Sequence, residues 1–233
     1  MPTIQVNGIG IYYETRGEGE PLTLLMGLGT DISEWEGIIG WLARKYKVIA
    51  MDNRGAGRSD KPDEPYSIEM MANDTAGLLR ALAVERTNLL GISMGGRIAL
   101  SLTLAHPELV GKLVLASTSA SGRSLRGRWW FRVMGLLSSS PLFRSKYPQP
   151  RYAFLRQREA SVSFDVSNRL REIRAPTLIL HGKRDRTMPY PFAEATQAGI
   201  ASSTLVPFEG SHLFMLFRER QRFLDIVAEF LDR

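Results

Sequence analysis

The amino-acid sequence predicts an α/β fold: a mostly parallel, eight-stranded sheet flanked by helices on both faces. Short apolar runs alternate with segments of helical periodicity, a pattern typical of strand–helix–strand units. The first two runs instead flank Asn7-Gly8, a pair that favours a tight hairpin turn, so an antiparallel hairpin should form one edge of the sheet. A chain of 233 residues that is 44% hydrophobic and 23% charged suits one domain, 1–233, with a sizeable core.

The expected elements follow one another along the chain without an internal repeat or a domain linker. The strands are predicted at residues 3–6, 9–14, 22–26 and 47–51, in the apolar run that starts at 87, and at 112–116, 177–180 and 204–208. The helices are predicted at 35–44, from an N-cap at Ser67 to about 83, and at 97–106, 190–198 and 216–231.

The strongest single motif is Gly-x-Ser-x-Gly at residues 91–95. It ends an apolar run, and a helical pattern follows at once, which is the layout of a nucleophile elbow. In such an elbow a strained turn from strand to helix lifts the serine, here Ser93, clear of the sheet. Gly91 and Gly95 would supply positions without a Cβ where side chains would collide. The motif has little specificity by itself, so the flanking strand and helix carry the prediction.

Several features bear on where the chain works. The stretch 89–105 is apolar enough to resemble a membrane span, but Arg97 and three glycines interrupt it, which favours a buried strand and helix. The absence of cysteine excludes disulfides, thiolate catalysis and cysteine metal sites. The N-terminus has no basic region followed by an apolar one, so we expect no signal peptide and a cytoplasmic location.

A serine hydroxyl is a poor nucleophile at neutral pH and needs a base within hydrogen-bond reach. The chain has three histidines. His106 follows a predicted helix and is typical of a helix terminator, and His181 ends a predicted strand, where structural packing is the favoured role. His212 follows the last strand in a loop, which makes it the candidate base for Ser93.

The base in turn needs a carboxylate to fix its tautomer. Asp185 lies between a predicted strand and a predicted helix, where a turn or capping role is the alternative. The order Ser93, Asp185, His212 along the chain matches the order expected for this arrangement on an α/β sheet. Each of these residues, and Leu28, follows a predicted strand, which is where sites form in parallel sheets.

These motifs resemble the α/β-hydrolases, in particular the branch of short-lid serine esterases, enol-lactonases and carbon–carbon hydrolases. The resemblance covers nearly the whole chain and is weakest from about 122 to 164. The segments that carry it are Gly27-Leu28-Gly29-Thr30-Asp31 with Trp35, the run Asp52-Asn53-Arg54-Gly55-Ala56-Gly57-Arg58-Ser59, the elbow, Gly182 through Asp185 to Pro189, and Gly210-Ser211-His212.

The resemblance implies that Ser93 attacks a carbonyl, that His212 takes and returns the proton, and that Asp185 orients His212. It also implies an oxyanion hole made by the backbone N–H groups of Leu28 and Met94. Haloalkane dehalogenases and epoxide hydrolases of the same fold use an aspartate as the nucleophile, so a serine indicates acyl transfer.

Two further details follow from the resemblance. Met26 departs from it, because relatives often carry a histidine there, but main-chain donors should make this of little consequence. The Arg54 segment resembles a loop that buttresses the elbow, and we expect it to be structural. No phosphate loop, metal-ligand cluster or dinucleotide fingerprint is found, so no cofactor and no metal are expected.

The insertion at about 119–171 would form a short lid, and it holds much of the basic charge. Nine Lys or Arg and no Asp or Glu lie between 120 and 158, so the remaining 21 basic residues face 24 acidic ones. Arg126, Trp129 and Trp130 are the candidate substrate-binding residues of this lid. The residue pattern of the lid predicts an amphipathic helix over the pocket. Two alternatives are that its arginines bind a substrate carboxylate, or that it contacts a membrane or an oily interface.

The functional prediction is a serine carboxylesterase that acts on small or medium acyl esters. The runner-up is a hydrolase of an anionic enol-lactone or of a ring-cleavage dienoic acid, whose carbon–carbon bond is broken. A ligand receptor or signalling protein on the same fold is the third alternative. The expected partner is a small-molecule ester or lactone, with no nucleic acid and no integral membrane segment. The oligomeric state stays open, a homodimer included.

Overall fold

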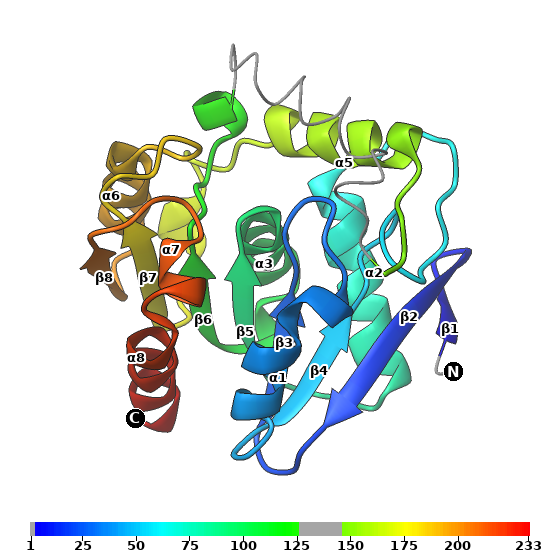
Figure 1. Ribbon diagram of the computed structural model, residues 1–233, viewed down its shortest axis with the longest axis horizontal. Helices are drawn as coiled ribbons and strands as arrows, with labels where there is room; N and C mark the ends of the chain where they lie inside the picture. The colour runs from blue at the N-terminus through cyan, green and yellow to red at the C-terminus, as the bar shows by residue number, and fades with distance from the viewer. Residues whose placement is uncertain (1–2, 126–145) are drawn as a thin grey trace.

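The computed structural model describes residues 3–125 and 146–233 (Figure 1). Within these residues, eight strands form one sheet in the order β1-β2-β4-β3-β5-β6-β7-β8. The pairs β1·β2 and β2·β4 are antiparallel, and the other neighbouring pairs are parallel. The predicted fold class is therefore confirmed. The strands are β1 (Thr3–Val6), β2 (Ile9–Arg16), β3 (Pro21–Leu25), β4 (Lys47–Met51), β5 (Thr87–Ile92), β6 (Val110–Ala116), β7 (Thr177–Gly182) and β8 (Ser203–Phe208).

Local sequence signals explain where several elements begin. Asn7 and Gly8 both adopt positive φ angles, 50° and 79°, which gives the turn the twist that suits the β1–β2 hairpin. The Ser67 side chain accepts a hydrogen bond from the Met70 N–H at 3.1 Å and caps the helix α2 (Ile68–Ala81), as predicted.

Helices cover both faces of the sheet (Figure 1). One apolar cluster lies between the sheet and α2, α3 and α6, and a second lies between the sheet and α1 and α8. Leu89 of β5 belongs to the first cluster and Leu90 to the second, as expected for a strand buried on both faces. The helices are α1 (Glu36–Leu42), α2 (Ile68–Ala81), α3 (Met94–Ala105), α5 (Arg151–Ser163), α6 (Tyr190–Gly199), α7 (Phe214–Phe217) and α8 (Arg220–Asp232), with short 3-10 turns η1 (Ile32–Trp35), η2 (Pro107–Leu109), η3 (Gly122–Leu125) and η5 (Leu170–Glu172).

The C-terminal helix corrects one prediction. A single helix was expected over 216–231, but the chain forms the short α7 and then α8. Glu219 leaves the helical conformation, with φ −116° and ψ 30°, and turns the chain between them. This change of direction lets Leu216 of α7 and Phe223 of α8 enter the same apolar cluster. Helical periodicity alone does not reveal such a break.

The loops beyond the carboxyl ends of the parallel strands carry the candidate site residues. Helix α5 lies beyond this end of the sheet (Figure 1). It belongs to the segment 119–171 that the sequence predicts as an insertion, together with η3 and η5. Arg126, Trp129 and Trp130, the predicted substrate-binding residues, lie outside the described residues.

Candidate active site

The turn from β5 into α3 is strained at Ser93, which has φ 56° and ψ −115°. A non-glycine residue with positive φ is unusual and concentrates at functional sites. The chain closes tightly around it: a Cβ at Gly91 would lie 2.5 Å from the Gly95 carbonyl oxygen, and one at Gly95 would lie 2.0 Å from the Leu25 oxygen. These two glycines are therefore required by backbone contact, and the predicted elbow geometry is present.

Three predicted side chains from separate loops form one hydrogen-bonded chain. Ser93 Oγ lies 3.0 Å from His212 Nε2, and His212 Nδ1 lies 2.6 Å from Asp185 Oδ2. An ionised carboxylate only accepts hydrogen bonds, so it fixes the proton on Nδ1 and leaves Nε2 free to accept the Ser93 proton. The network thus assigns the tautomer that a general base requires.

Asp185 is held firmly in this chain. Its side chain is buried, and its Oδ1 accepts the N–H groups of Thr187 at 2.7 Å and Met188 at 2.8 Å. Oδ1 is therefore occupied by main-chain donors, and Oδ2 faces His212. The rotamer of the carboxylate is fixed before any substrate arrives.

The loop that carries His212 is also tied to the sheet. A Cβ at Gly182 would lie 2.5 Å from the Gly210 carbonyl oxygen, so a glycine at the end of β7 lets this loop approach. On its other side, the Ser117 hydroxyl donates to the His212 carbonyl oxygen. The imidazole keeps 19% of its side chain exposed, which leaves it open to a substrate while its backbone is fixed.

Two main-chain N–H groups were predicted to face the oxyanion. Met94 is the first residue of α3, and its N–H belongs to the first turn, where a helix supplies no internal acceptor. Leu28 lies in the loop after β3. Gly27, directly before it, is so close to Ser93 that an added Cβ would lie 3.6 Å from the Ser93 Cβ. Both donors therefore belong to segments that border the serine.

The loop that contains Arg54 is hydrogen-bonded to the segment that follows β3. Asn53 donates to the Met26 carbonyl oxygen at 3.1 Å, and Asp52 accepts the N–H of Ile32 at 2.8 Å. Arg54 is buried and pairs with Asp74 through two hydrogen bonds of 2.8 and 3.0 Å. These contacts fit the structural role expected for the segment.

The other two histidines lie outside the Ser93 chain. His106 caps the end of α3, where its N–H donates to the Leu102 carbonyl oxygen at 2.8 Å. His181 is fully buried, and its Nε2 lies 2.7 Å from the Met188 carbonyl oxygen. Burial lowers the pKa of His181, which favours the neutral ring. The Met188 carbonyl oxygen can only accept a hydrogen bond, so Nε2 carries the proton and donates.

Arg97 is fully buried one turn after Ser93. Its guanidinium donates to the Ser161 carbonyl oxygen at 2.7 Å, the Ser119 carbonyl oxygen at 3.3 Å and the Ser121 carbonyl oxygen at 3.4 Å. Burial lowers its pKa to about 10, so it remains protonated at neutral pH. Arg97 thereby ties the elbow helix to α5 and to the loop after β6.

Sequence reasoning missed two buried glutamines beside the site, Gln149 and Gln157. Gln157 accepts the N–H of Gly29, the residue after the predicted oxyanion donor Leu28. No motif or spacing marks either glutamine, since each acts through contacts with segments that are distant in the sequence.

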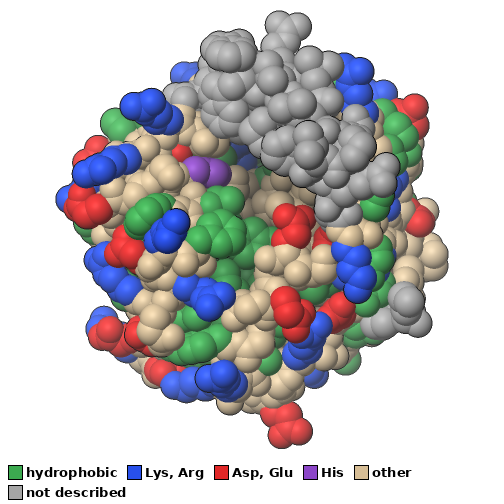
Figure 2. Space-filling model, viewed as in Figure 1, with side chains coloured by type: hydrophobic (Ala, Val, Ile, Leu, Met, Phe, Trp, Pro, Cys, Tyr) green, Lys and Arg blue, Asp and Glu red, His purple; other side chains and the backbone are tan. Residues whose placement is uncertain are grey.

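The surface around the site is apolar in part. Figure 2 shows hydrophobic side chains gathered beside a histidine at the edge of a hollow. On α7, directly after the His212 loop, the side chains of Phe214 and Phe217 are exposed, Phe217 by 69%. Phe214 follows His212 by two residues, so these exposed aromatic groups belong to the segment that carries the predicted base.

Over residues 3–125 and 146–233, no three His, Asp or Glu side chains gather into a group that could hold a metal ion. The same part of the chain contains no helix that is both long and apolar enough to span a membrane.

Several known proteins are similar to this chain. Residues 20–139 match the family described as "alpha/beta hydrolase fold". AB hydrolase superfamily protein YisY of Bacillus subtilis is 29% identical, with 95% of each chain covered. A 3-oxoadipate enol-lactonase of Acinetobacter baylyi is 26% identical over 91% of this chain and 89% of its own.

Solved structures are also similar to this chain. A hydrolase from Pseudomonas aeruginosa PA01 superposes with a TM-score of 0.87 at 27% identity, covering 100% of this chain and 98% of its own. An esterase from Exiguobacterium antarcticum superposes with a TM-score of 0.85 at 28% identity, covering 99% of both chains.

Proposed function

Because the chain belongs to the alpha/beta hydrolase family and is a hydrolase, we propose that it cleaves carboxylic esters through an acyl-enzyme intermediate. In this proposal Ser93 is the nucleophile, His212 the general base and then acid, and Asp185 the group that orients His212. The observation that carries the proposal is the continuous chain from Asp185 through His212 to Ser93, with distances of 2.6 and 3.0 Å.

The first half of the reaction acylates the enzyme. The Ser93 oxygen attacks the ester carbonyl carbon as its proton passes to His212 Nε2, and the carbonyl π electrons move onto oxygen. Asp185 stabilises the imidazolium that forms. The resulting oxyanion accepts hydrogen bonds from the N–H groups of Leu28 and Met94. The intermediate then expels the alcohol, which takes the proton from His212.

The second half releases the acid. Water enters where the alcohol left, gives a proton to His212 Nε2 and attacks the acyl carbon. The tetrahedral intermediate uses the same two N–H donors, and its collapse returns the proton to Ser93. The carboxylic acid leaves and the serine is regenerated, so one ester and one water are converted into one acid and one alcohol.

We further propose that residues 1–233 form a single domain in which the insertion at 119–171 covers the site. In support, Gln157 of α5 contacts Gly29 in the loop after β3. The esterase from Exiguobacterium antarcticum, similar over 99% of both chains, supports the choice of a carboxylic ester as substrate.

The second candidate is hydrolysis of an anionic lactone or of a carbon–carbon bond in a ring-cleavage product. It is favoured by the basic insertion and by the similarity to a protein named 3-oxoadipate enol-lactonase. Against it, Arg123 pairs with Asp165 at 3.3 Å and Arg156 with Asp63 at 3.4 Å, so these two insertion arginines already face carboxylates. The neutral ester is therefore the first proposal. A receptor role on the same fold predicts ligand-dependent stabilisation with little turnover.

A panel of neutral p-nitrophenyl esters of increasing chain length, assayed beside an anionic enol-lactone, separates these functions. Good turnover of the esters supports the proposal, whereas turnover of the lactone alone supports the second candidate. Ser93→Ala should lower kcat by about 10⁴-fold or more. Ser202→Ala, which changes an exposed serine before β8, serves as the matched control. Hydrolysis that survives in a folded Ser93→Ala protein would refute the nucleophile.

A further inference from the structure

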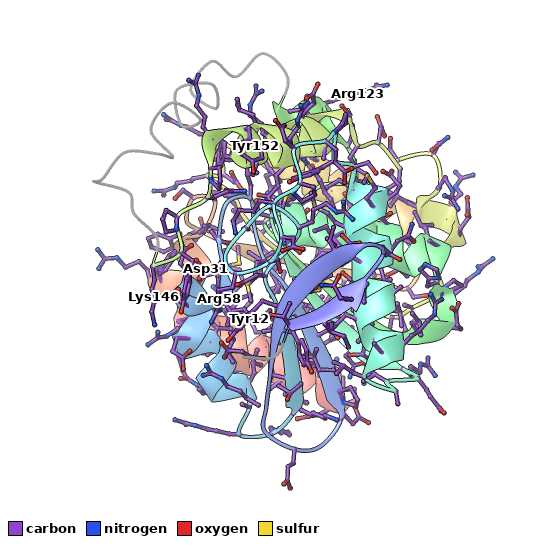
Figure 3. The ribbon with its side chains drawn as sticks, turned by 90° about the vertical axis from the view of Figure 1, so that its right-hand side faces the viewer. Tyr12, Asp31, Arg58, Arg123, Lys146 and Tyr152 are labelled. Carbon is purple, nitrogen blue, oxygen red and sulfur yellow. The ribbon has the colours of Figure 1, made fainter. Side chains whose placement is uncertain are left out.

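Helix α5 and the residues before it dock on the loop that follows β4. The Arg58 guanidinium lies between the rings of Tyr12 and Tyr147, 3.6 and 4.4 Å from their centroids. Further along, the Tyr152 hydroxyl donates to the Lys61 carbonyl oxygen at 2.7 Å. Figure 3 shows Tyr12, Arg58 and Lys146 close together, with Tyr152 above them. These contacts join α5 and the residues before it to the loop after β4.

One side chain of α5 reaches the predicted oxyanion loop. Gln157 is fully buried, and its Oε1 accepts the Gly29 N–H at 3.1 Å. Its Nε2 donates to the Arg54 carbonyl oxygen at 2.7 Å. The amide therefore bridges the loop after β3 and the loop after β4.

A second glutamine fixes the orientation of this amide. Gln149 Nε2 donates to Gln157 Oε1 at 3.0 Å and to the Gly55 carbonyl oxygen at 2.7 Å. The Gln157 oxygen thus faces two donors and its nitrogen faces a carbonyl acceptor, so a flipped amide would lose all three partners. Both polar ends of the buried Gln157 amide are therefore satisfied, which favours one arrangement of this group.

Gly29 is also clamped by shape. Its φ is 74°, and a Cβ at this position would lie 3.0 Å from the Phe154 ring and 3.3 Å from Gln149 Oε1. The backbone of the loop is therefore pressed against α5, with a hydrogen bond at the same residue. The preceding residue, Leu28, bears the N–H that our proposed function assigns to the oxyanion. Leu28 and Gly29 are joined by one peptide bond, so a shift of the Gly29 backbone also moves this donor.

We propose that Gln157 is a positioning residue for the oxyanion hole, so that the insertion sets the rate of bond cleavage as well as covering the site. The inference rests on the proposed function. It assigns to a buried amide of α5 the task of holding the Leu28–Gly29 backbone at the distance that the oxyanion requires. Gln149 supports it by holding the amide of Gln157 in place.

The central test compares Gln157→Met with Tyr152→Phe. Methionine fills a similar volume but makes neither hydrogen bond, whereas Tyr152→Phe removes one bond between α5 and the β4 loop without touching Gly29. Since one oxyanion donor is worth roughly 10²- to 10³-fold, Gln157→Met should lower kcat by about 10-fold or more and change KM by less than about twofold. Hydrogen exchange at the Gly29 amide should become faster in the same variant. Tyr152→Phe should keep the wild-type values of kcat and KM and the wild-type exchange rate of the Gly29 amide.

A boronic acid gives a readout of the tetrahedral state without turnover. Phenylboronic acid adds to a serine hydroxyl to form a tetrahedral adduct, so its affinity should fall in Gln157→Met in proportion to kcat. If Gln157 had a merely structural role, KM would rise and kcat would fall together in both α5 variants. That result would overturn the inference. So would an unchanged kcat in Gln157→Met.

Gln157→Glu covers the case in which the methionine variant does not fold. A protonated glutamic acid reproduces the acceptor toward Gly29 and the donor toward Arg54, and an ionised one loses the donor. The ratio of its kcat to that of wild type should therefore be near one at the acid end of the active range and fall as pH rises; a ratio that does not change with pH contradicts the inference. An inactive wild type would refute the proposed function, while an active wild type that tolerates Gln157→Met refutes only the role of Gln157.

Discussion

His181 Nε2 lies 3.4 Å from Asp185 Oδ2, the oxygen that also faces His212. The same Nε2 makes its shorter contact, 2.7 Å, with the Met188 carbonyl oxygen, and Met188 in turn donates its N–H to Asp185 Oδ1. A buried, neutral histidine thus stands behind the carboxylate of the proposed triad. It supports the turn that holds Asp185 without entering the chain of proton transfer.

The pKa of His181 predicts a pH-dependent stability. Burial, opposed in part by Met188 and Asp185 and assisted by His212, lowers this pKa below the ordinary value near 6.5. The unfolded chain then binds more protons than the folded one below that value, so the contribution to stability is complete above about pH 6.5 and is lost as pH falls. Urea unfolding between about pH 7 and pH 5.5 should show this decline. His181→Gln keeps a donor for Met188 and removes the titration, so its slope should be smaller; an identical slope would contradict the assignment.

Asp185→Asn should abolish most activity and leave the fold intact. Asparagine can still accept the N–H groups of Thr187 and Met188, but its amide nitrogen would face His212 Nδ1 and impose the wrong tautomer. The same change of the triad aspartate in a serine protease lowers kcat by about 10⁴-fold, and we expect a loss of this order here. Asp232→Asn, at the C-terminal end of α8, is the matched control and should retain wild-type kcat. Steady-state ester hydrolysis checks both, and a variant with near-normal kcat would exclude Asp185 as the orienting group.

The strands and the elbow at Ser93 could be predicted because each is encoded by residues that are close together in the sequence. Buried strands are short apolar runs, and the elbow needs glycines at fixed positions, as the contacts of Gly91 and Gly95 show. His212 and Asp185 follow strands, so the parallel sheet itself brings them to one edge. Their convergence on Ser93 depends on topology more than on any one side chain.

The contacts of Gln157 could not be predicted, because they are set by tertiary packing. Gly29 and Gln157 are 128 residues apart, and a glutamine in a helix has no spacing that marks its partner. The break between α7 and α8 was missed for a related reason, since the residues on both sides suit a helix and only their packing turns the chain. The substrate-binding roles of Arg126, Trp129 and Trp130 stay predictions.

The tight approach at the elbow predicts a large cost for Gly95→Ala. Its Cβ would meet the Leu25 carbonyl oxygen at 2.0 Å, and backbone cannot rotate away as a flexible side chain can. The variant should lose about 1–3 kcal/mol or more of unfolding free energy, and kcat should fall because the elbow must shift. Gly40→Ala is the matched control, because nothing lies within 4 Å of a Cβ in this position of α1. It should gain about 0.5–1 kcal/mol from helix propensity. Chemical denaturation measures both, and equal effects would show that Gly95 is not sterically required.

The last prediction tests whether Arg97 holds the elbow helix α3 in place. Arg97→Met removes a buried charge, which is favourable, but leaves the carbonyl oxygens of Ser119 and Ser161 without their guanidinium donor. Each unsatisfied buried acceptor costs about 1–3 kcal/mol. Burial lowers the pKa of Arg97 to about 10, which penalises the charge without removing it at neutral pH. We therefore expect a net loss of about 2–4 kcal/mol in urea unfolding. Arg169→Met, which breaks only an exposed pair with Glu172, should leave the free energy of unfolding close to that of wild type. If Arg97→Met were as stable as wild type, the cost of burying the charge would equal the value of its hydrogen bonds, and Arg97 would not be what fixes α3 against α5.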